Sequence, residues 1–213
     1  MKLRLAALAA VIMLSACRHA GDLTSDNGGG IYAIRSSCPI LGVPAGTGDI
    51  TLFNPPESRD SRAIDVSATI TDVRATCADS GNDVVSTATF TIVALRSQAG
   101  PARQVVLPYF DTALQGGTRV VAKRVGQAVL NFPAGNLHAS TQVQATVRVN
   151  RSVATLPANV QQFLTRPRKA GDADAAVDPL SDPSVRTAVA DATFEHLVGF
   201  EMSQDQLKYN ATR

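Results

Sequence analysis

Residues 139–150 read ASTQVQATVRVN, and apolar and polar side chains alternate through most of this stretch. A period of two places alternate side chains on opposite faces of a β-strand. The apolar face holds Ala139, Val143, Ala145, Val147 and Val149. A strand with one apolar and one polar face is typical of an antiparallel sheet that is hydrated on one side.

The same pattern occurs twice earlier in the chain. One face of residues 64–70 carries Ile64, Val66, Ala68 and Ile70, and one face of residues 88–94 carries Ala88, Phe90, Ile92 and Ala94. After residue 71 the apolar positions shift by one, to Val73, Ala75 and Cys77. Because such a slip turns the core face outward, we expect a β-bulge or a strand break near Thr71-Asp72.

Further strands are expected at Asp49–Phe53, at 103–110 and at 118–132. Pro108 indicates a sheet edge or a strand end, and Gly126 indicates an interruption. Six or seven strands therefore lie within residues 38–153, without a helical pattern between them. We predict two antiparallel sheets packed as an immunoglobulin- or fibronectin-like β-sandwich, with a small barrel as the alternative.

Helical signals appear only after residue 153, so we expect 154–213 to form a helical C-terminal extension. Its predicted parts are two helical turns over 157–164, an irregular connection over 166–181, a helix from the N-cap Asp182 and Pro183 to Gly199, and a final short helix opened by the capping box Ser203–Gln206.

The first seventeen residues resemble an export signal. Lys2 and Arg4 precede the apolar residues 5–14, and Leu14-Ser15-Ala16-Cys17 follows. Ten apolar residues are too few to span a bilayer comfortably, but they match a secretory signal.

This segment resembles the lipobox of bacterial lipoproteins. The resemblance implies removal of residues 1–16 and a lipid anchor on Cys17, with a diacylglyceryl thioether and an N-acyl chain of the palmitate kind. An ordinary secretory signal is the alternative. Arg18, in place of an Asp, favours the outer membrane. Residues 17–37, which include Gly28-Gly29-Gly30, then form a lipidated N-terminus and a tether to the folded domain.

Composition excludes several classes of protein. The chain has 213 residues, of which 45% are hydrophobic and 18% charged, which is unlike a disordered or a polytopic membrane protein. Aromatic residues make up 5% and Trp is absent, so the core must be aliphatic. Without Lys2 and Arg4, 18 basic residues balance 18 acidic ones. No strong positive field therefore indicates nucleic acid as a partner.

The chain has three cysteines. Lipidation of Cys17 leaves an even pair in an oxidising periplasm, so we predict a disulfide between Cys38 and Cys77. Two buried free thiols are the alternative.

Few residues are candidates for chemistry. His19 lies beside Cys17, His138 falls on the polar face of a strand, and His196 is expected late in the main helix, where it suits the helix dipole. No known hydrolase motif or phosphate-binding loop occurs. We expect no catalytic residue and no cofactor.

Two charged segments are candidate binding sites. Asp172, Asp174 and Asp178 form a candidate calcium site, although an EF-hand's glycine and final glutamate are missing. A solvated, salt-bridged loop is the alternative. The run Arg166-Pro167-Arg168-Lys169 is a candidate contact for anionic head groups.

These features predict a membrane-anchored envelope lipoprotein that is a structural or accessory subunit, with another envelope protein as its partner and recognition through a strand edge or a helix face. The alternatives are a binding module for a small ligand, a glycan or calcium, and an envelope hydrolase. We expect no enzymatic activity.

Overall fold

The computed structural model describes residues 36–167, 171–174 and 176–212. Its elements, in chain order, are β1 (Ile40–Gly42), β2 (Asp49–Phe53), η1 (Ser61–Ala63), β3 (Ile64–Ser80), β4 (Asp83–Arg96), β5 (Arg103–Gln115), β6 (Arg119–Phe132), β7 (His138–Asn150), α2 (Ala158–Thr165), η2 (Pro179–Ser181), α3 (Pro183–Asp191), β8 (Phe194–Phe200) and α4 (Gln204–Thr212).

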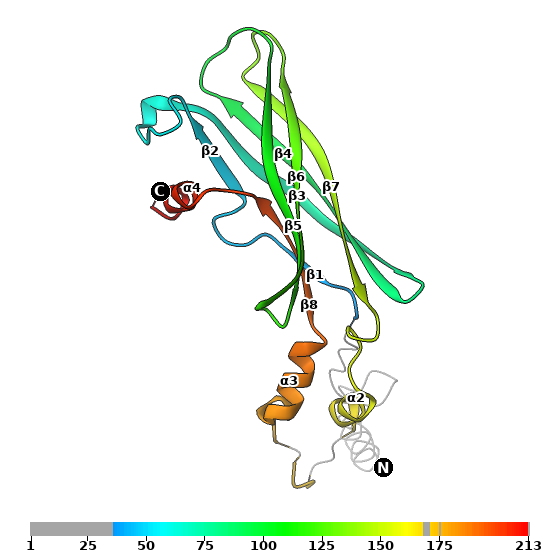
Figure 1. The fold of residues 1–213 in the computed structure, drawn as a ribbon. Coiled ribbons are helices and arrows are strands. Elements are labelled where there is room, and N and C mark those ends of the chain that lie inside the picture. Colours follow the sequence, from blue (N-terminus) through cyan, green and yellow to red (C-terminus); the bar gives the residue numbers. More distant parts are fainter. Residues whose placement is uncertain (1–35, 168–170, 175, 213) are drawn as a thin grey trace, which may run out of the picture.

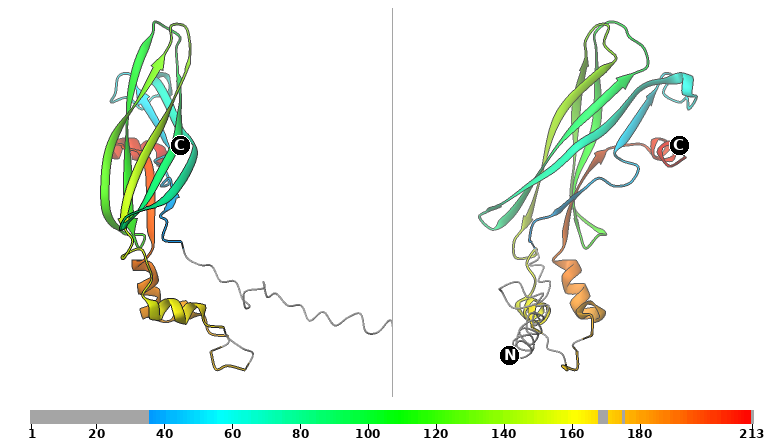
Figure 2. Two further views of the ribbon diagram at one scale, coloured as in Figure 1. Left: turned by 90° about the vertical axis from the view of Figure 1, so that its right-hand side faces the viewer. Right: turned by 180° about the vertical axis from the view of Figure 1, so that it is seen from behind.

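The strands form two four-stranded sheets packed face to face (Figures 1 and 2). The first, here sheet A, has the order β1-β8-β5-β6, and the second, sheet B, has the order β2-β3-β4-β7. All neighbouring strands are antiparallel except β1 and β8, which are parallel. The predicted mainly-β sandwich with a short C-terminal helix is therefore confirmed.

The core lies between the sheets where the alternation predicted it. The predicted apolar faces of β4 and β7 are buried throughout, and Val66, Ala68 and Ile70 of β3 join them. Sheet A contributes Leu107, Leu130 and Phe200. Burial of these side chains supplies the main driving force for packing the two sheets.

The predicted bulge in β3 is present. The register with β4 shifts between Thr71 and Arg74, and Asp72 has a φ of 52°. Beyond the bulge most of β3 is exposed, so its apolar residues leave the core face. The prediction that the core face resumes at Ala75 and Cys77 is therefore wrong.

Pro108 does mark a local edge, although β5 lies in the interior of sheet A. Strand β8 pairs with β5 only from Tyr109 to Gln115, so the part of β5 that ends at Pro108 has β6 as its one described neighbour. Gly126 does not interrupt β6, because it accommodates the ring of Tyr109 on the facing strand. A Cβ at Gly126 would lie 2.4 Å from Tyr109 Cζ.

The predicted long helix ends early. Asp182 caps α3 by accepting a hydrogen bond from the Ser184 amide, as expected, but α3 stops at Asp191. Residues Phe194–Phe200 form β8 between β1 and β5. Within them Phe194, His196, Val198 and Phe200 are buried with a period of two, which is a strand pattern. The predicted boundary between a sandwich at 38–153 and a helical extension at 154–213 is therefore wrong.

Between β7 and β8 the chain leaves the sandwich and returns. We call residues 151–193 the arm; it carries α2, η2 and α3 and projects from one end of the sandwich (Figures 1 and 2). The predicted helical turns over 157–164 correspond to α2, which has no buried residue. In α3, Val185 and Val189 are buried.

Helix α4 follows β8 and packs against the side of β2. The Ser203 amide donates to Gln206 Oε1 at 2.9 Å, and the Gln206 amide donates to Ser203 Oγ at 3.3 Å, so the predicted capping box is confirmed. Tyr209 packs edge-on against Phe53, and Asn210 Nδ2 donates to the carbonyl of Gly46.

The loops at the opposite end of the sandwich from the arm converge on Arg96, whose exposed fraction is 4%. Its guanidinium donates to four carbonyl oxygens, those of Asn136, Pro101, Gly100 and Pro133, at 2.6 to 3.1 Å. Because these carbonyls belong to the loops after β4 and after β6, Arg96 ties the two sheet-to-sheet connections together.

Candidate functional site

A polar cluster lies inside the sandwich, where apolar side chains would be expected. His196 of β8 is 0% exposed, and Ser86 of β4 and Asp111 of β5 are also buried. The His196 Nδ1 atom lies 3.0 Å from Ser86 Oγ, and Nε2 lies 2.9 Å from Asp111 Oδ1. The cluster joins sheet A to sheet B through hydrogen bonds.

The roles of the three groups follow from their chemistry. An ionised Asp111 accepts only, so Nε2 carries a hydrogen and donates to it. In the neutral imidazole, Nδ1 then accepts a hydrogen bond from the Ser86 hydroxyl. The residue types are those of a hydrolytic triad, but no substrate can reach a Ser86 that is itself 0% exposed. The geometry therefore supports a buried structural bridge.

The sequence analysis missed this cluster because its members come from three strands. It placed His196 in a helix and did not single out Ser86 or Asp111. The one available signal was a polar residue on the apolar face of an alternating sequence. Ser86 lies two residues before Ala88 and four before Phe90, and therefore points to the same buried side of β4.

Tyr109 borders the same end of the core. Its ring packs edge-on against Phe90 with centroids 5.7 Å apart. Burial, and secondarily the negative charge of Asp111, raises the pKa of Tyr109 above its ordinary value. The phenol therefore remains neutral and acts as a packing group.

Cys38 and Cys77 form a disulfide, as predicted. Cys38 lies two residues before β1, the outer strand of sheet A. Cys77 lies in the part of β3 beyond Thr69, where the pairing with β2 has ended. The bond therefore links the chain just before β1 to the part of β3 that has lost its pairing with β2 and forms a local edge of sheet B.

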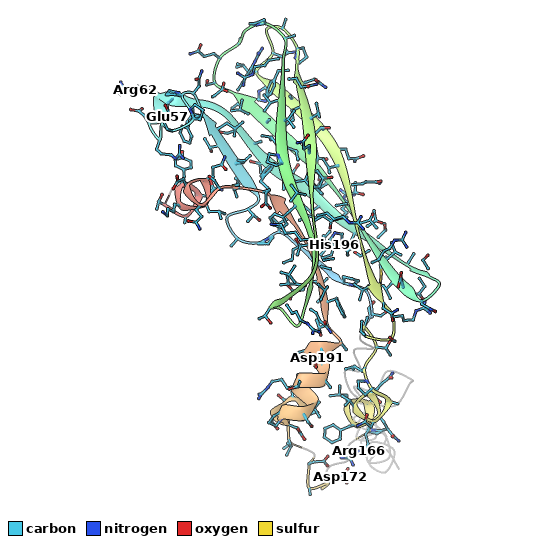
Figure 3. The ribbon with its side chains drawn as sticks, viewed as in Figure 1. Glu57, Arg62, Arg166, Asp172, Asp191 and His196 are labelled. Carbon is cyan, nitrogen blue, oxygen red and sulfur yellow. A yellow bond between two sulfur atoms is a disulfide. The ribbon has the colours of Figure 1, made fainter. Side chains whose placement is uncertain are left out.

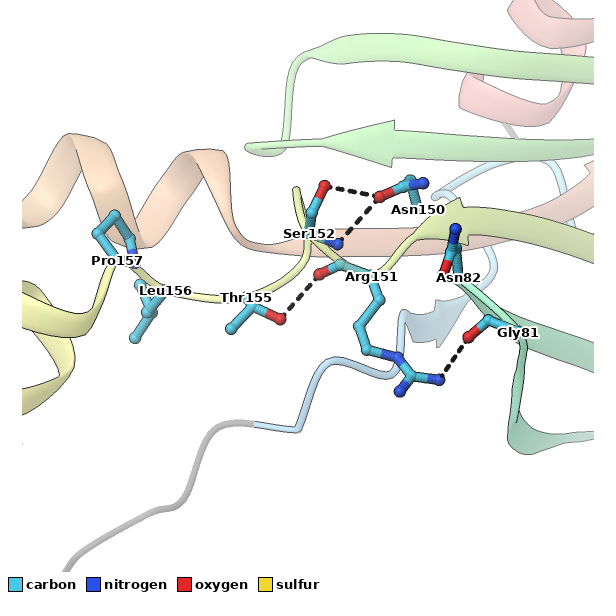
Figure 4. A pocket seen from close by; sticks show the side chains of 8 residues that line it. All are labelled: Gly81, Asn82, Asn150, Arg151, Ser152, Thr155, Leu156 and Pro157. Atoms are coloured by element: carbon cyan, nitrogen blue, oxygen red, sulfur yellow. Dashed lines mark hydrogen bonds between the residues drawn. The ribbon is translucent and has the colours of Figure 1, made fainter.

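An open hollow of about 730 Å³ lies where the β3–β4 turn meets the end of β7. Figure 4 shows Asn82, Asn150 and Arg151 around it, with Leu156 and Pro157 on the side of the arm. Arg151 Nη2 donates to the Gly81 carbonyl at 3.1 Å and pairs with Asp79 at 3.2 Å. Arg151 Nε is buried without a hydrogen-bond partner. This arrangement offers amide and guanidinium donors beside a small apolar wall.

A second, more apolar hollow of about 330 Å³ lies on the outer face of sheet A beside α4. Phe110, Leu197 and Leu207 line it. At its rim, Lys123 pairs with Glu201 at 2.9 Å and lies over the ring of Phe110. The rim of this apolar hollow therefore carries a partly exposed ion pair.

The acidic residues proposed for calcium have other partners. Asp174 pairs with Arg166, and Asp178 caps η2 by accepting from the Leu180 amide at 2.9 Å. Asp172 lies with Arg166 at the end of the arm (Figure 3). Among the described residues, no group of three His, Cys, Asp or Glu side chains is arranged to hold a metal ion. The arrangement favours the salt-bridged loop.

The remaining predicted residues divide into two groups. His138 is exposed at the start of β7, as predicted. Cys17, His19, Arg168 and Lys169 lie outside the described residues. None of the helices in the described part of the chain is long and apolar enough to cross a bilayer.

Comparison with known proteins assigns the chain to no family and to no function. No protein-family model matches the chain, and no curated protein matches it. One solved structure is similar, the crystal structure of a DUF1425 family member from Shewanella sp. pv-4 at 1.81 Å resolution. It shares 14% sequence identity, covers 51% of this chain and 82% of its own, and superposes with a TM-score of 0.25. A match this distant says nothing about function.

Proposed function

We propose that this chain is an envelope lipoprotein, in which acylated Cys17 holds the β-sandwich at the outer membrane as an accessory subunit. The pairing of Cys38 with Cys77 is the observation that carries this proposal. The bond uses two of the three cysteines and leaves Cys17, at the lipobox-like position, with a thiol for lipidation. Several acyl chains anchor a protein far more firmly than one chain does.

An interaction role is supported by the outer strand of sheet A. Strand β6 is the last strand of its sheet, and residues 119–125 are exposed on both faces. Val120, Val121 and Val125 are among the exposed apolar side chains. An edge of this kind offers backbone hydrogen bonds to an extended segment of a partner.

A non-catalytic role follows from the position of the buried cluster. An acyl-transfer reaction needs a nucleophile that touches the substrate and donors for the oxyanion. Ser86 and His196 are both 0% exposed. We therefore propose that the three residues stabilise the fold and catalyse no reaction.

The anchor is tested by mass spectrometry of the mature protein purified from membranes. We expect an N-terminus at residue 17 with a mass increase for the diacylglyceryl and acyl groups. A Cys17→Ser variant serves as the control and should lack both the cleavage and the lipid. A wild-type chain cleaved without lipid would refute the proposal.

The accessory role is tested by crosslinking in intact cells, followed by affinity purification of the full-length protein. We expect one recurring envelope protein, which is lost with Cys17→Ser. Recovery of abundant envelope proteins only, at the same level in both strains, would contradict an accessory role.

The hollow around Asn82 and Arg151 favours a second function, the binding of a small polar ligand such as a glycan. The donors and the apolar wall described above are the groups that orient a sugar. Thermal shift measurements with a glycan panel and with calcium test this function. A stabilisation that Asn82→Ala abolishes would support it, and no shift with any ligand would exclude it for that panel.

A further inference from the structure

The outer face of sheet A, on the side away from the core, is apolar. Side chains alternate along β5, so Val105 and Leu107 enter the core while Val106 lies on the outer face. On β6, Val129 lies opposite Val106 and shares that face. The large apolar side chains of the outer face are Val106, Phe110 and Leu114 of β5, Val120, Val125 and Val129 of β6, and Leu197 of β8. An antiparallel sheet with a hydrated face normally carries polar side chains there, so this face has the composition of a covered one.

Sheet B has the opposite composition on its outer face. Polar side chains predominate: Ser67 and Thr69 of β3, Thr87, Thr89 and Thr91 of β4, and Gln142, Gln144 and Thr146 of β7. Val93 and Leu95, near the end of β4, are the exposed large apolar residues of this sheet. The two sheets therefore share one core but differ on their outer faces, and only that of sheet B is suited to solvent.

None of the described helices covers the outer face of sheet A. The arm projects beyond the end of the sandwich, and α4 packs against β2 (Figure 1). Consequently Val106, Val120, Val125 and Val129 are 44%, 57%, 56% and 39% exposed. Beside them lies the hollow of about 330 Å³, lined by half-buried side chains such as that of Leu197. Together the face leaves on the order of 400 Å² of apolar surface in water, a size that marks interaction sites.

Charges of both signs border this apolar centre. Lys123 pairs with Glu201 at 2.9 Å, and the two side chains are 47% and 37% exposed. Glu195 lies opposite Leu114, nearer the arm. A two-fold axis can set a cation of one copy against an anion of the other, so two identical faces with both signs at the rim are complementary. A surface of one sign, such as that of anionic lipids, lacks this complementarity.

The extent and flatness of the face also fit a second copy of the chain. A stable complex buries about 800 Å² on each partner, and somewhat more than half of this area is apolar. The apolar centre and its charged rim together meet that requirement. Two sheet faces of branched side chains pack about 10 Å apart, as sheets A and B do inside the sandwich. Dimers with a two-fold axis are the commonest oligomers of soluble domains.

We propose that the outer face of sheet A is the interface of a two-fold dimer of this chain. The valines of β5 and β6 pack against those of the second copy, and exchanged ion pairs close the rim. The backbone edge of β6 stays at the side of the interface, where an extended segment of another protein can still pair with it. The dimer goes beyond the accessory role and does not require lipid on Cys17.

Photo-crosslinking of the full chain in intact cells tests the interface. A benzoylphenylalanine replaces Val129 on sheet A in one protein and Val93 on sheet B in the other, at positions that are 39% and 41% exposed. Each protein is produced with two different affinity tags in the same cells. We expect a product of twice the chain mass that carries both tags, with a yield about fivefold or more higher from position 129 than from position 93, because a stable interface holds the two copies in contact.

Two substitutions on the face test its chemistry in the protein with the reporter at position 129. Val125→Asp should lower the yield of the double-mass product about tenfold, because the dimer would bury two unpaired carboxylates. Val93→Asp, which makes the same change on the outer face of sheet B, should leave the yield unchanged. Val125→Thr keeps a β-branched side chain in the strand and should lower the yield by a smaller factor, about threefold, at an unchanged melting temperature.

Other results would overturn the dimer. These are the absence of a double-mass product from position 129, equal yields from positions 129 and 93, and a yield that Val125→Asp and Val93→Asp lower equally. A crosslinked product of a different mass from position 129 would give the face to another protein and would exclude a second copy as its occupant. The mass of the mature N-terminus tests the lipid on Cys17 separately, so either proposal can fail without the other.

Discussion

His196 of sheet A is hydrogen-bonded to Ser86 of sheet B, with 3.0 Å between the ring Nδ1 and the hydroxyl oxygen, beside a core cluster of apolar residues. Ser86→Ala leaves the buried nitrogen without a partner. We expect the free energy of unfolding to fall by about 1–3 kcal/mol. Ser140→Ala, at an exposed position of β7, is the control and should have little effect. Equal stability of the two variants in urea unfolding would show that the bridge contributes nothing.

Replacing the imidazole should cost more than removing the hydroxyl. His196→Leu leaves the Asp111 carboxyl buried without its partner at 2.9 Å, and a buried charged group left without a hydrogen bond costs more than the roughly 1–3 kcal/mol of a neutral one. The double variant His196→Leu with Asp111→Leu removes the stranded group as well. We expect it to be more stable than His196→Leu alone in the same urea titration. Additive losses would contradict direct coupling of the two side chains.

Arg96 holds the loops at the far end of the sandwich through four carbonyl oxygens. Lysine has one ammonium group and cannot reproduce the planar fork. Arg96→Lys should therefore lower the free energy of unfolding by about 2 kcal/mol, because several of the part-buried hydrogen bonds of the guanidinium are lost. Hydrogen exchange should also increase in residues 97–102 and 133–137. Arg148→Lys, on the exposed face of β7, is the matched control and should change neither measurement.

The Cys38–Cys77 disulfide closes a loop with a sequence separation of 39. The chain-entropy model assigns about 4 kcal/mol to a loop of this length. We expect the double variant Cys38→Ser with Cys77→Ser to unfold at lower denaturant concentration than the oxidised protein. Reduction of the wild-type protein should produce the same shift. A reduced protein as stable as the oxidised one would show that the bond is dispensable for folding.

Asp182 links the stability of α3 to pH. Hydrogen bonds from the side chain and then the backbone of Ser184 lower the pKa of this exposed carboxyl. Its charge therefore stabilises the folded state above its unfolded pKa of about 3.9, and the contribution is lost as the pH falls through the lower folded pKa. Asp182→Asn keeps a capping oxygen but removes the charge. The stability difference between the wild type and Asp182→Asn should disappear at low pH and be constant near neutrality. A difference that is the same at all pH values would exclude the carboxylate as its source.

The alternation of apolar and polar residues predicted the strands well, because a strand that buries only one of its faces needs an apolar residue at every second position. The runs ending at Ala94 and at Val149 became β4 and β7 with the expected residues inside. The bulge at Asp72 followed from the same rule, since a shift in phase requires an extra residue. The caps Asp182 and Ser203 were identified for a similarly local reason, because they satisfy amides within three residues.

Features that depend on distant partners could not be predicted. Strand β8 has a helix directly before it, and its seven residues gain their strand conformation from β1 and β5 on either side. Pairing with these two strands outweighed the helical spacing of the local sequence, and the segment became a strand. Ser86 and Asp111 lie 110 and 85 residues from His196, so no local pattern connected the three.

The place of β8 in sheet A determines when the sandwich can be completed. It is the last strand in the sequence, yet it lies between the first strand and β5. Until residue 200 is available, β1 has no neighbour in its sheet and the bridge from His196 cannot form. A nascent chain that has not reached β8 therefore exposes an unpaired edge of β5 and an open core. Full-length synthesis is a precondition for a native fold, and fragments that end before β8 become natural substrates for chaperones and proteases.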